Sequence, residues 1–353
     1  MRVELYRDDV VLARDVVASA QAHDGRTRLF LVLEHEGVTG YGEISPQPVA
    51  LNGDPGLDEV LVDLAVVLAR LGDVLTREGE LPIWSRTARL GATTPSALFA
   101  LALVEMAVLD RELRVGGLAV ADLWPARQAT RVQATVSSLD DATPWHVNEA
   151  VARVRVKSAP GALSKVARTR LASLTVPVIL DFNCSATGDD EVLEQVRDVE
   201  KLAEISAVEQ PYDAGNLVDH ARLAARLNVP LSLDEGVRGV ADLTRVANYQ
   251  AASMVCVKPA RVGGVANARA MLERAERLGL EAYVGGFFES PFARRVHRAL
   301  ADSARVGPSD LDVVDLRDTP EETSVLAGGF GLRPAPATLE RARRVTVAEG
   351  ASP

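Results

Sequence analysis

The first part of the chain shows strands followed by helices. Val10–Val17 and Arg28–His35 are rich in β-forming residues, and glycines near residue 40 mark turns. Leu57–Leu75 and Ser96–Leu113 carry apolar residues at helical spacing. Strands and helices that follow one another without alternating are typical of an α+β domain.

From about Arg131 the pattern changes to short apolar runs that alternate with helical stretches. Such near-continuous apolar runs are typical of parallel strands covered by helices. Seven runs predict strands: Val132–Val136, Val151–Lys157, Val176–Asn183, Ser206–Gln210, Val229–Glu235, Ser253–Lys258 and Glu281–Gly285. With an eighth strand expected around Leu311–Val314, the alternation predicts an α/β fold, a (β/α)-barrel.

The tail of the chain loses this alternation and is expected to return to the first domain. We therefore predict a capping domain over residues 1–125, completed by about 320–353, and a catalytic barrel over 126–319.

Composition narrows the class of protein. Of 353 residues, 47% are hydrophobic and 25% charged, as in ordinary globular proteins. No run reaches the ~18 uncharged apolar residues that a membrane span needs, and the first residues lack a signal-peptide pattern. Only two cysteines are present, so we expect the reducing cytoplasm. A net charge of −10 without a basic stripe excludes a nucleic-acid partner, and the sequence leaves room for a homo-oligomer.

Lysine is scarce. Of 39 basic residues only four are lysines: Lys157, Lys165, Lys201 and Lys258. A desolvated lysine can lose its proton, whereas arginine effectively cannot. Lys165 and Lys201 lie on polar, helix-like stretches, which leaves Lys157 and Lys258 as candidates for proton chemistry.

Polar residues recur at the end of successive predicted strands. These residues are Lys157, Asp181, Glu209, Asp234 and Lys258, and their separations are 24, 28, 25 and 24 residues. Each separation is one strand-plus-helix unit, so all five are expected at one mouth of the barrel, where catalytic groups lie in this fold. A single charged residue after an apolar run can simply mark the end of a strand. Carboxylates at the ends of three consecutive strands, flanked by lysines, indicate a functional site.

Three carboxylates at one mouth repel one another unless they share a cation. Oxygen ligands without a nearby histidine favour Mg²⁺, with Mn²⁺ as a substitute. The predicted ligands are Asp181, Glu209 and Asp234. Residues that follow them are expected to orient the ligands or to pair with Lys258: Asn183, Gln210 and Glu235.

This set resembles the muconate-lactonising subgroup of the enolase superfamily. In that subgroup a Lys-x-Lys ends the second strand, Asp, Glu and Asp on the next three bind the metal, and a lysine on the sixth faces the first pair. Further similar runs are Val208-Glu209-Gln210-Pro211, Lys258-Pro259-Ala260-Arg261-Val262-Gly263-Gly264, Gly285-Gly286-Phe287-Phe288-Glu289-Ser290 and, in the capping domain, Gly40-Tyr41-Gly42-Glu43-Ile44-Ser45-Pro46. The last run is most like o-succinylbenzoate synthases. The resemblance implies an enolase-like (β/α)7β barrel with an α+β capping domain.

Arg155 departs from the subgroup, because it stands where the first lysine of Lys-x-Lys is expected. In the family the second lysine is the base and the first lowers its pKa. Arginine keeps that charge, so we expect Lys157 to remain a base, while Lys258, with Glu235 as its expected partner, stays protonated. No histidine ends the seventh strand, which speaks against the mandelate-racemase branch.

The resemblance implies Mg²⁺-dependent removal of a proton α to a carboxylate, giving an enediolate. Dehydration by one base, an o-succinylbenzoate synthase-like lyase reaction of menaquinone biosynthesis, is favoured. An N-acylamino-acid racemase or dipeptide epimerase, a muconate-type cycloisomerase and a metal-binding barrel without catalysis stay open as alternatives.

The substrate is expected to be a small carboxylate chosen by cap loops around Ala18–Thr27 and Pro46–Gly53. The sequence marks four residues as weak candidates for substrate contacts: Ser19, Gly285, Gly286 and Glu289.

Overall fold

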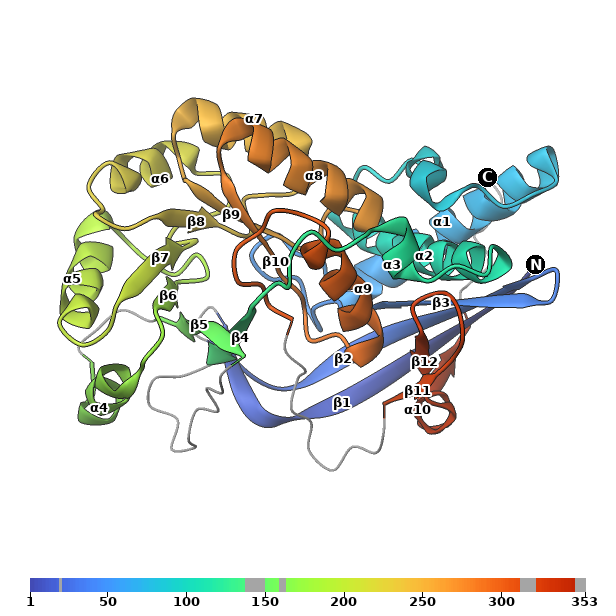
Figure 1. Cartoon of the computed structure of the whole chain (residues 1–353), viewed down its shortest axis with the longest axis horizontal. Coiled ribbons are helices and arrows are strands. Elements are labelled where there is room, and N and C mark those ends of the chain that lie inside the picture. The colour runs from blue at the N-terminus through green and yellow to red at the C-terminus, as the bar shows by residue number, and fades with distance from the viewer. Residues whose placement is uncertain (19–20, 137–149, 159–162, 312–321, 347–353) are drawn as a thin grey trace.

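The computed structural model describes residues 1–18, 21–136, 150–158, 163–311 and 322–346, and for residues 13–18, 21–24 and 136 the backbone only. Figure 1 shows a curved parallel sheet with its helices beside a long antiparallel sheet. The strands are β1 (Arg2–Ala18), β2 (Gln21–His35), β3 (Val38–Ile44), β4 (Val132–Val136), β5 (Val151–Lys157), β6 (Val178–Asp181), β7 (Ile205–Glu209), β8 (Leu231–Leu233), β9 (Met254–Val257), β10 (Glu281–Val284), β11 (Thr323–Val325), β12 (Leu332–Pro334) and β13 (Arg343–Val345).

Helices cover both sheets. They are α1 (Leu57–Glu78), the 3-10 helix η1 (Trp84–Leu90), α2 (Pro95–Val115), α3 (Val120–Leu123), α4 (Lys165–Ser173), α5 (Asp189–Glu200), α6 (Leu217–Ala224), α7 (Val240–Tyr249), α8 (Val265–Leu278), α9 (Pro291–Asp302) and α10 (Pro336–Arg341).

The capping domain is built on the antiparallel order β13-β1-β2-β3. Leu29, Leu31 and Leu33 alternate along β2 and belong to the same core cluster as the apolar faces of α1 and α2. Gly40 and Gly42 let β3 approach α2 closely, since a Cβ at either position would lie 2.2 Å from a helix carbonyl. The first sheet is thereby fixed against the helix that also contacts the barrel.

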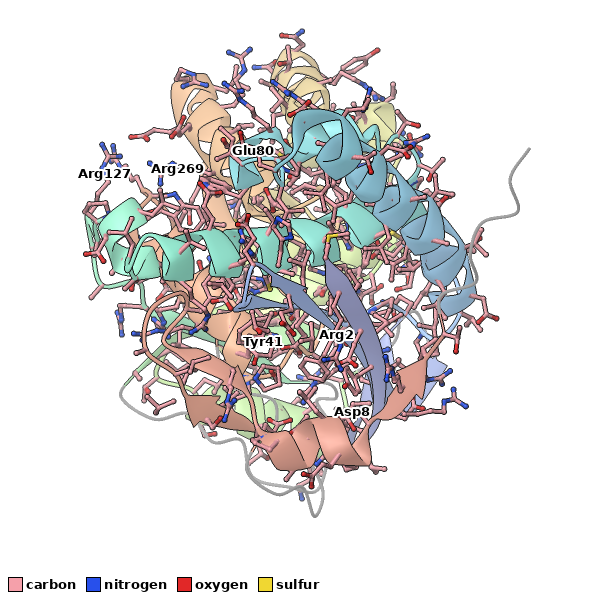
Figure 2. All side chains as sticks on the ribbon, turned by 90° about the vertical axis from the view of Figure 1, so that its right-hand side faces the viewer. Arg2, Asp8, Tyr41, Glu80, Arg127 and Arg269 are labelled. Atoms are coloured by element: carbon pink, nitrogen blue, oxygen red, sulfur yellow. The ribbon has the colours of Figure 1, made fainter. Side chains whose placement is uncertain are left out.

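The C-terminal segment returns to this sheet. Strand β13 pairs with β1, and Arg341 on α10 binds Asp8 of β1 at 2.7 Å. Figure 2 looks onto this side of the molecule, where α10 lies next to Asp8.

The parallel sheet has the order β10-β9-β8-β7-β6-β5-β4, so every strand lies beside its neighbour in the chain. The segment after α9 closes the ring. The Asp310 N–H donates to the carbonyl of Val284 in β10, the Ser309 N–H donates to Arg131 just before β4, and the Ser309 carbonyl accepts the N–H of Gln133 in β4. The (β/α)-barrel with a capping domain is thus confirmed.

One expectation lies mostly outside the described residues, and a second one needs correction. The expected eighth strand at Leu311–Val314 lies mostly outside the described residues, and the bonds that close the barrel come earlier, at Gly307–Asp310. The expected cap loop at Ala18–Thr27 is largely strand, since Val16 to Ala18 pair with Gln21 to His23. Polar residues hid the strand, because a strand without an apolar face has no period-2 pattern.

Candidate active site

The five predicted residues meet at one end of the barrel. Lys157, Asp181 and Glu209 each end their strand and lie side by side, in the registers Lys157–Asp181 and Asp181–Glu209. Asp234 and Lys258 follow the last residues of β8 and β9. Parallel strands place these side chains at the same mouth, as the spacing predicted.

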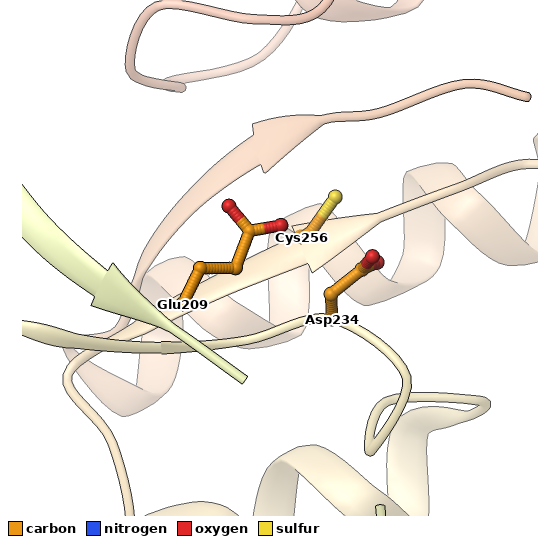
Figure 3. Close-up of side chains that lie close together, drawn as sticks. All are labelled: Glu209, Asp234 and Cys256. Atoms are coloured by element: carbon orange, nitrogen blue, oxygen red, sulfur yellow. The ribbon is translucent and has the colours of Figure 1, made fainter. Parts of the chain in front are cut away.

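Two of the predicted metal ligands lie close together. Ligand atoms of Glu209, Asp234 and Cys256 all lie within 4.8 Å of one another (Figure 3). Burial raises the pKa of the Cys256 thiol well above its ordinary value. A protonated thiol is a poor ligand for a hard cation, so we assign Cys256 to the lining of the barrel.

The third predicted ligand, Asp181, turns toward the neighbouring strand. Its Oδ2 accepts a hydrogen bond from Lys157 Nζ at 2.6 Å, and its Oδ1 accepts the N–H of Asn183 at 3.0 Å. Its charge still acts on Glu209. The set of three ligands therefore stays a prediction, with two members clustered and the third next to them.

Glu209 shows that the site suits a cation. It is fully buried, and its Oε2 has no hydrogen-bond partner in the part of the chain that the structure describes. Burial and repulsion by Asp181 raise its pKa to about 8, although Arg155 opposes this shift. A buried oxygen with a free lone pair, beside further carboxylates, fits Mg²⁺.

Asp234 lies between two cations. Lys258 Nζ donates to its Oδ2 at 2.7 Å, and the Arg261 guanidinium bonds its Oδ1. Burial favours the neutral acid, but Arg261 and Lys258 hold the pKa of Asp234 well below its usual range. The same pairing raises the pKa of Lys258, which burial alone lowers. Asp234, and not the expected Glu235, is thus the partner of Lys258.

Arg155 contacts three carboxylates of the site. Its Nη2 donates to Asp310 at 2.6 Å, its Nη1 donates to Glu209 at 3.3 Å, and its Nε lies 3.9 Å from Asp181. Burial opposes the charge, but these carboxylates raise the pKa of Arg155 well above its ordinary value. We expected a cation whose task is to lower the pKa of Lys157. The contacts show a guanidinium that also joins β5 to the segment that closes the barrel.

The residues that follow the predicted ligands form hydrogen bonds across neighbouring strand ends. Asn183 Nδ2 donates to Glu235 at 3.3 Å, and Gln210 Oε1 accepts the N–H groups of Asp234 at 2.9 Å and Gly236 at 3.1 Å. Asn183 and Gln210 have φ values of 44° and 37°, a left-handed conformation that is uncommon outside glycine. Such strain at the ends of strands is a feature of functional sites.

A cavity of about 50 Å³ opens above these residues, between barrel and cap. Its lining residues are Arg26, Gln47, Leu51, Asn52, Asp54, Thr135, Arg155, Lys157, Asn183, Glu235, Lys258, Arg261, Gly286, Phe287 and Phe288. The expected loop Pro46–Gly53 is part of this wall. Asn52 donates to the carbonyl of Asn183 at 3.1 Å, and the loop is closed onto the barrel there.

The weak candidates for substrate contacts fall in different places. Ser19 lies outside the described residues. Gly286 lines the cavity, whereas Gly285 makes room for Lys258, since a Cβ there would lie 2.9 Å from the lysine Cγ. Glu289 is buried away from the cavity wall, where its Oε2 accepts the Phe287 N–H at 2.7 Å and faces Arg294 at 3.4 Å. Glu289 therefore supports the conformation of the loop that contains Phe287.

Four charged residues of the site were not predicted: Arg26, Asp54, Arg261 and Asp310. Arg261 donates two hydrogen bonds, of 2.8 and 2.7 Å, to the carboxylate of Asp54 in the capping domain. Because Arg261 also bonds Asp234, it links the cap loop to that carboxylate. Its position three residues after Lys258 was a usable signal. Asp310 follows no apolar run, and Arg26 lies inside a strand, so the sequence gives no comparable signal for either residue.

Comparisons with known proteins agree with this architecture. A sequence model of the family described as "Enolase C-terminal domain-like" matches residues 139–323. N-succinylamino acid racemase from Amycolatopsis sp is 29% identical over 262 residues, 67% of this chain and 69% of that protein. o-Succinylbenzoate synthase from Bacillus subtilis is 27% identical over 294 residues, 78% of this chain and 75% of that one.

Solved structures share the fold. Muconate lactonizing enzyme from Pseudomonas putida superimposes with a TM-score of 0.75 at 18% identity, over 97% of this chain and 99% of that chain. L-Ala-D/L-Glu epimerase from Bacillus subtilis gives 0.74 at 20% identity, over 94% and 98%. Among the described residues, no helix is long and apolar enough to cross a membrane.

Proposed function

Because the chain belongs to the Enolase C-terminal domain-like family, we propose that it removes a proton α to a substrate carboxylate, with Lys157 as the base. It is an enolase-superfamily enzyme, of the lyase or isomerase kind. One observation carries the proposal. Lys157 and Lys258 line one cavity. Each bonds a different carboxylate of the acidic cluster that is made up of Asp181, Glu209 and Asp234: Lys157 bonds Asp181 at 2.6 Å, and Lys258 bonds Asp234 at 2.7 Å.

Members of the superfamily generally use Mg²⁺, and the acidic cluster is of the right chemistry. Asp181, Glu209 and Asp234 would hold the ion, and Asn183, Gln210 and Glu235 would orient them. When bound, Mg²⁺ supplies positive charge that stabilises the negative charge developing on the substrate carboxylate.

The chain's own residues then have distinct tasks. Lys157 takes the α-proton onto Nζ, which leaves the enediolate anion. Lys258 lies 4.6 Å from the centre of the Phe287 ring and 2.7 Å from Asp234, two contacts that favour its charged form. It is placed to stabilise the anion as a cation. The cap loop and Phe287 form part of the wall of the cavity.

For the fate of the anion we propose the o-succinylbenzoate synthase-like dehydration, in which the β-hydroxyl group leaves as water together with the proton that Lys157 has taken up. One base suffices for this reaction, which agrees with a Lys258 held as a cation. The presence of a second lysine supports one other candidate, racemisation of an N-acylamino acid, in which Lys258 returns the proton from the opposite face.

The test is to offer the Mg²⁺-loaded protein two kinds of substrate. The hydroxycyclohexadiene precursor of o-succinylbenzoate reports dehydration by absorbance, and both enantiomers of an N-succinylamino acid in D₂O report proton exchange by NMR. Wild type should dehydrate the precursor, and Lys157→Arg, which keeps the charge and loses the base, should be slower by about 10³-fold, or ~4 kcal/mol. Lys165→Arg, on the surface helix α4, is the matched control and should be unchanged.

Two outcomes would speak against the proposal. If Lys157→Arg kept more than about a tenth of kcat, a loss under ~1.4 kcal/mol, Lys157 is not the base. Equal exchange from both enantiomers, each abolished by replacing a different lysine with arginine, would establish the racemase instead.

A further inference from the structure

Arg26 is a buried cation in the wall that the capping domain contributes to the cavity. It lies on β2, paired with Val10 of β1, and only 4% of its surface is exposed. It lines the same cavity as Lys157 and Lys258. A ligand that fills this cavity would therefore contact Arg26 as well as the lysines.

Arg26 differs from the other arginines of the cavity in having no carboxylate partner among the described side chains. Arg155 and Arg261 each contact at least two carboxylates. Arg26 makes one hydrogen bond, from Nη1 to the neutral Oε1 of Gln47 at 2.9 Å, and its buried Nε has no partner among the described residues. Burial lowers its pKa to about 10, without an acidic neighbour that raises it. A buried charge is costly unless it is paired, so this guanidinium is suited to receive an anion.

The surroundings hold the guanidinium in a fixed position. The Arg26 Cζ lies 4.4 Å from the centre of the Phe288 ring, which supports its flat face. Phe288 has a φ of 81°, a strained value for a large residue, and its carbonyl accepts a hydrogen bond of 2.9 Å from the fully buried Arg28. Arg28 thus fixes the ring on which Arg26 lies. A preorganised fork of N–H groups matches a planar carboxylate.

We propose that Arg26 binds a second carboxylate of the substrate and thereby selects dianionic over monoanionic substrates. This inference rests on the proposed function, which places the first carboxylate at the end of the cavity lined by Lys157 and Lys258, the two lysines that bond Asp181 and Asp234. The two lysines already bond carboxylates of the protein, and Arg26 is the cation of the cavity wall that bonds none among the described residues. A substrate with a carboxylate at each end, such as one that carries a succinyl group, satisfies both ends.

The test uses two ligands that differ in one group. N-succinylglycine carries the second carboxylate, and its terminal amide is neutral with the same shape. Both are titrated by calorimetry into the full-length Mg²⁺-loaded protein. Wild type should bind the diacid at least ten times more tightly than the amide. Arg26→Met should lose at least tenfold in affinity for the diacid and less than twofold for the amide, and Arg26→Lys should recover part of the loss.

Arg7→Met on the adjacent strand, whose partner Asp9 is a surface residue, is the control and should bind as wild type does. Equal losses for both ligands in Arg26→Met, an unchanged preference, or no binding of the diacid to wild type would each overturn the proposal. Exchange of the glycine α-protons in D₂O, measured on the same samples, tests the chemistry separately. Exchange without preference for the diacid overturns the role of Arg26 alone, whereas preference without exchange supports that role and contradicts the proton abstraction.

Discussion

Arg155 illustrates how far one residue can depart from a family pattern and still fit the site. A lysine offers one point charge, whereas the guanidinium of Arg155 reaches Asp310 with one nitrogen and Glu209 with another. The charge that the family places beside the base is kept, and a structural link is added. The replacement is therefore not a simple exchange of one cation for another.

The charge on Glu209 leads to a prediction for metal binding. Its pKa of about 8 means that Mg²⁺ must displace a proton at neutral pH. The dissociation constant for Mg²⁺ should therefore fall about tenfold per pH unit between pH 6 and 8 and level off above pH 8. Glu209→Gln should bind Mg²⁺ at least ~10-fold more weakly at pH 8.5 and lose this dependence, as measured by calorimetry.

The surface variant Glu273→Gln, on the outer face of α8, is the matched control and should keep the wild-type profile. A Glu209→Gln variant with wild-type affinity and slope would remove Glu209 from the metal site.

Functional residues could be predicted only where they follow a recognisable pattern in the sequence. Lys157, Asp181, Glu209, Asp234 and Lys258 each come at the end of an apolar run, so their spacing revealed a common mouth. The partners within this set could not be predicted. Whether Lys258 bonds Asp234 or Glu235 depends on side-chain directions at a strand end, which no spacing rule fixes.

At the scale of elements, α8 begins in an unusual way. Its N-cap, Gly264, has no side chain, and the free N–H groups of Val265 and Ala266 bond Glu105 of α2 instead. A helix of the capping domain thus caps a helix of the barrel. These hydrogen bonds from Glu105 also fix the loop that runs from Lys258 into α8.

Removal of this carboxylate should therefore destabilise the protein. Glu105→Ala leaves one buried and one half-buried N–H group without their acceptor and opens a gap, so the free energy of unfolding should fall by about 1–3 kcal/mol. Glu105→Gln keeps an acceptor oxygen. The NH2 group of Gln replaces the other oxygen and cannot accept the second N–H, so the Gln variant should lose less stability than the Ala variant without matching wild type. Urea denaturation of both variants measures this, and equal losses would show that the acceptor is unimportant.

Most elements could be predicted from periodicity, because buried parallel strands and amphipathic helices have strong patterns. The closing segment could not. Gly307 and Pro308 precede Ser309, and proline has no N–H to donate to a neighbouring strand. Its bonds to β4 and β10 come from a few backbone groups without an apolar run. The β1–β2 hairpin was likewise hidden, since its polar tip resembles a loop.

At the scale of the whole molecule, buried acids should make stability depend on pH. Burial raises the pKa of Glu43 to about 7 and that of Glu105 to about 8, and burial with repulsion raises that of Glu209 to about 8. The folded chain therefore binds more protons than the unfolded chain from about pH 4.5 to 8, and unfolding free energy falls as pH rises through this window. His220 and His297, whose pKa values burial lowers, act in the opposite direction, but only below about pH 6.5.

The expected result, in buffer with a chelator, is a free energy of unfolding that falls between pH 7 and 8.5 by up to ~1.4 kcal/mol per pH unit for each proton involved. Glu105→Gln should make the fall shallower, whereas Glu80→Gln on the surface should not. Urea titrations at several pH values measure it. A stability that stays level or rises over this range would contradict the assignment.

Pairing of β13 with β1 has a consequence for how the protein is made. The first strand leaves the ribosome early, but its partner, Arg343–Val345, follows only after all of the barrel. Glu322, which bonds Arg28 beneath the Phe288 loop, also comes late. At roughly 5–20 residues per second, β1 waits some tens of seconds for its neighbour. The barrel can assemble during synthesis, but the cap that covers the lysines is completed last. Nascent chains stalled before residue 343 should therefore contain a formed barrel and an open mouth.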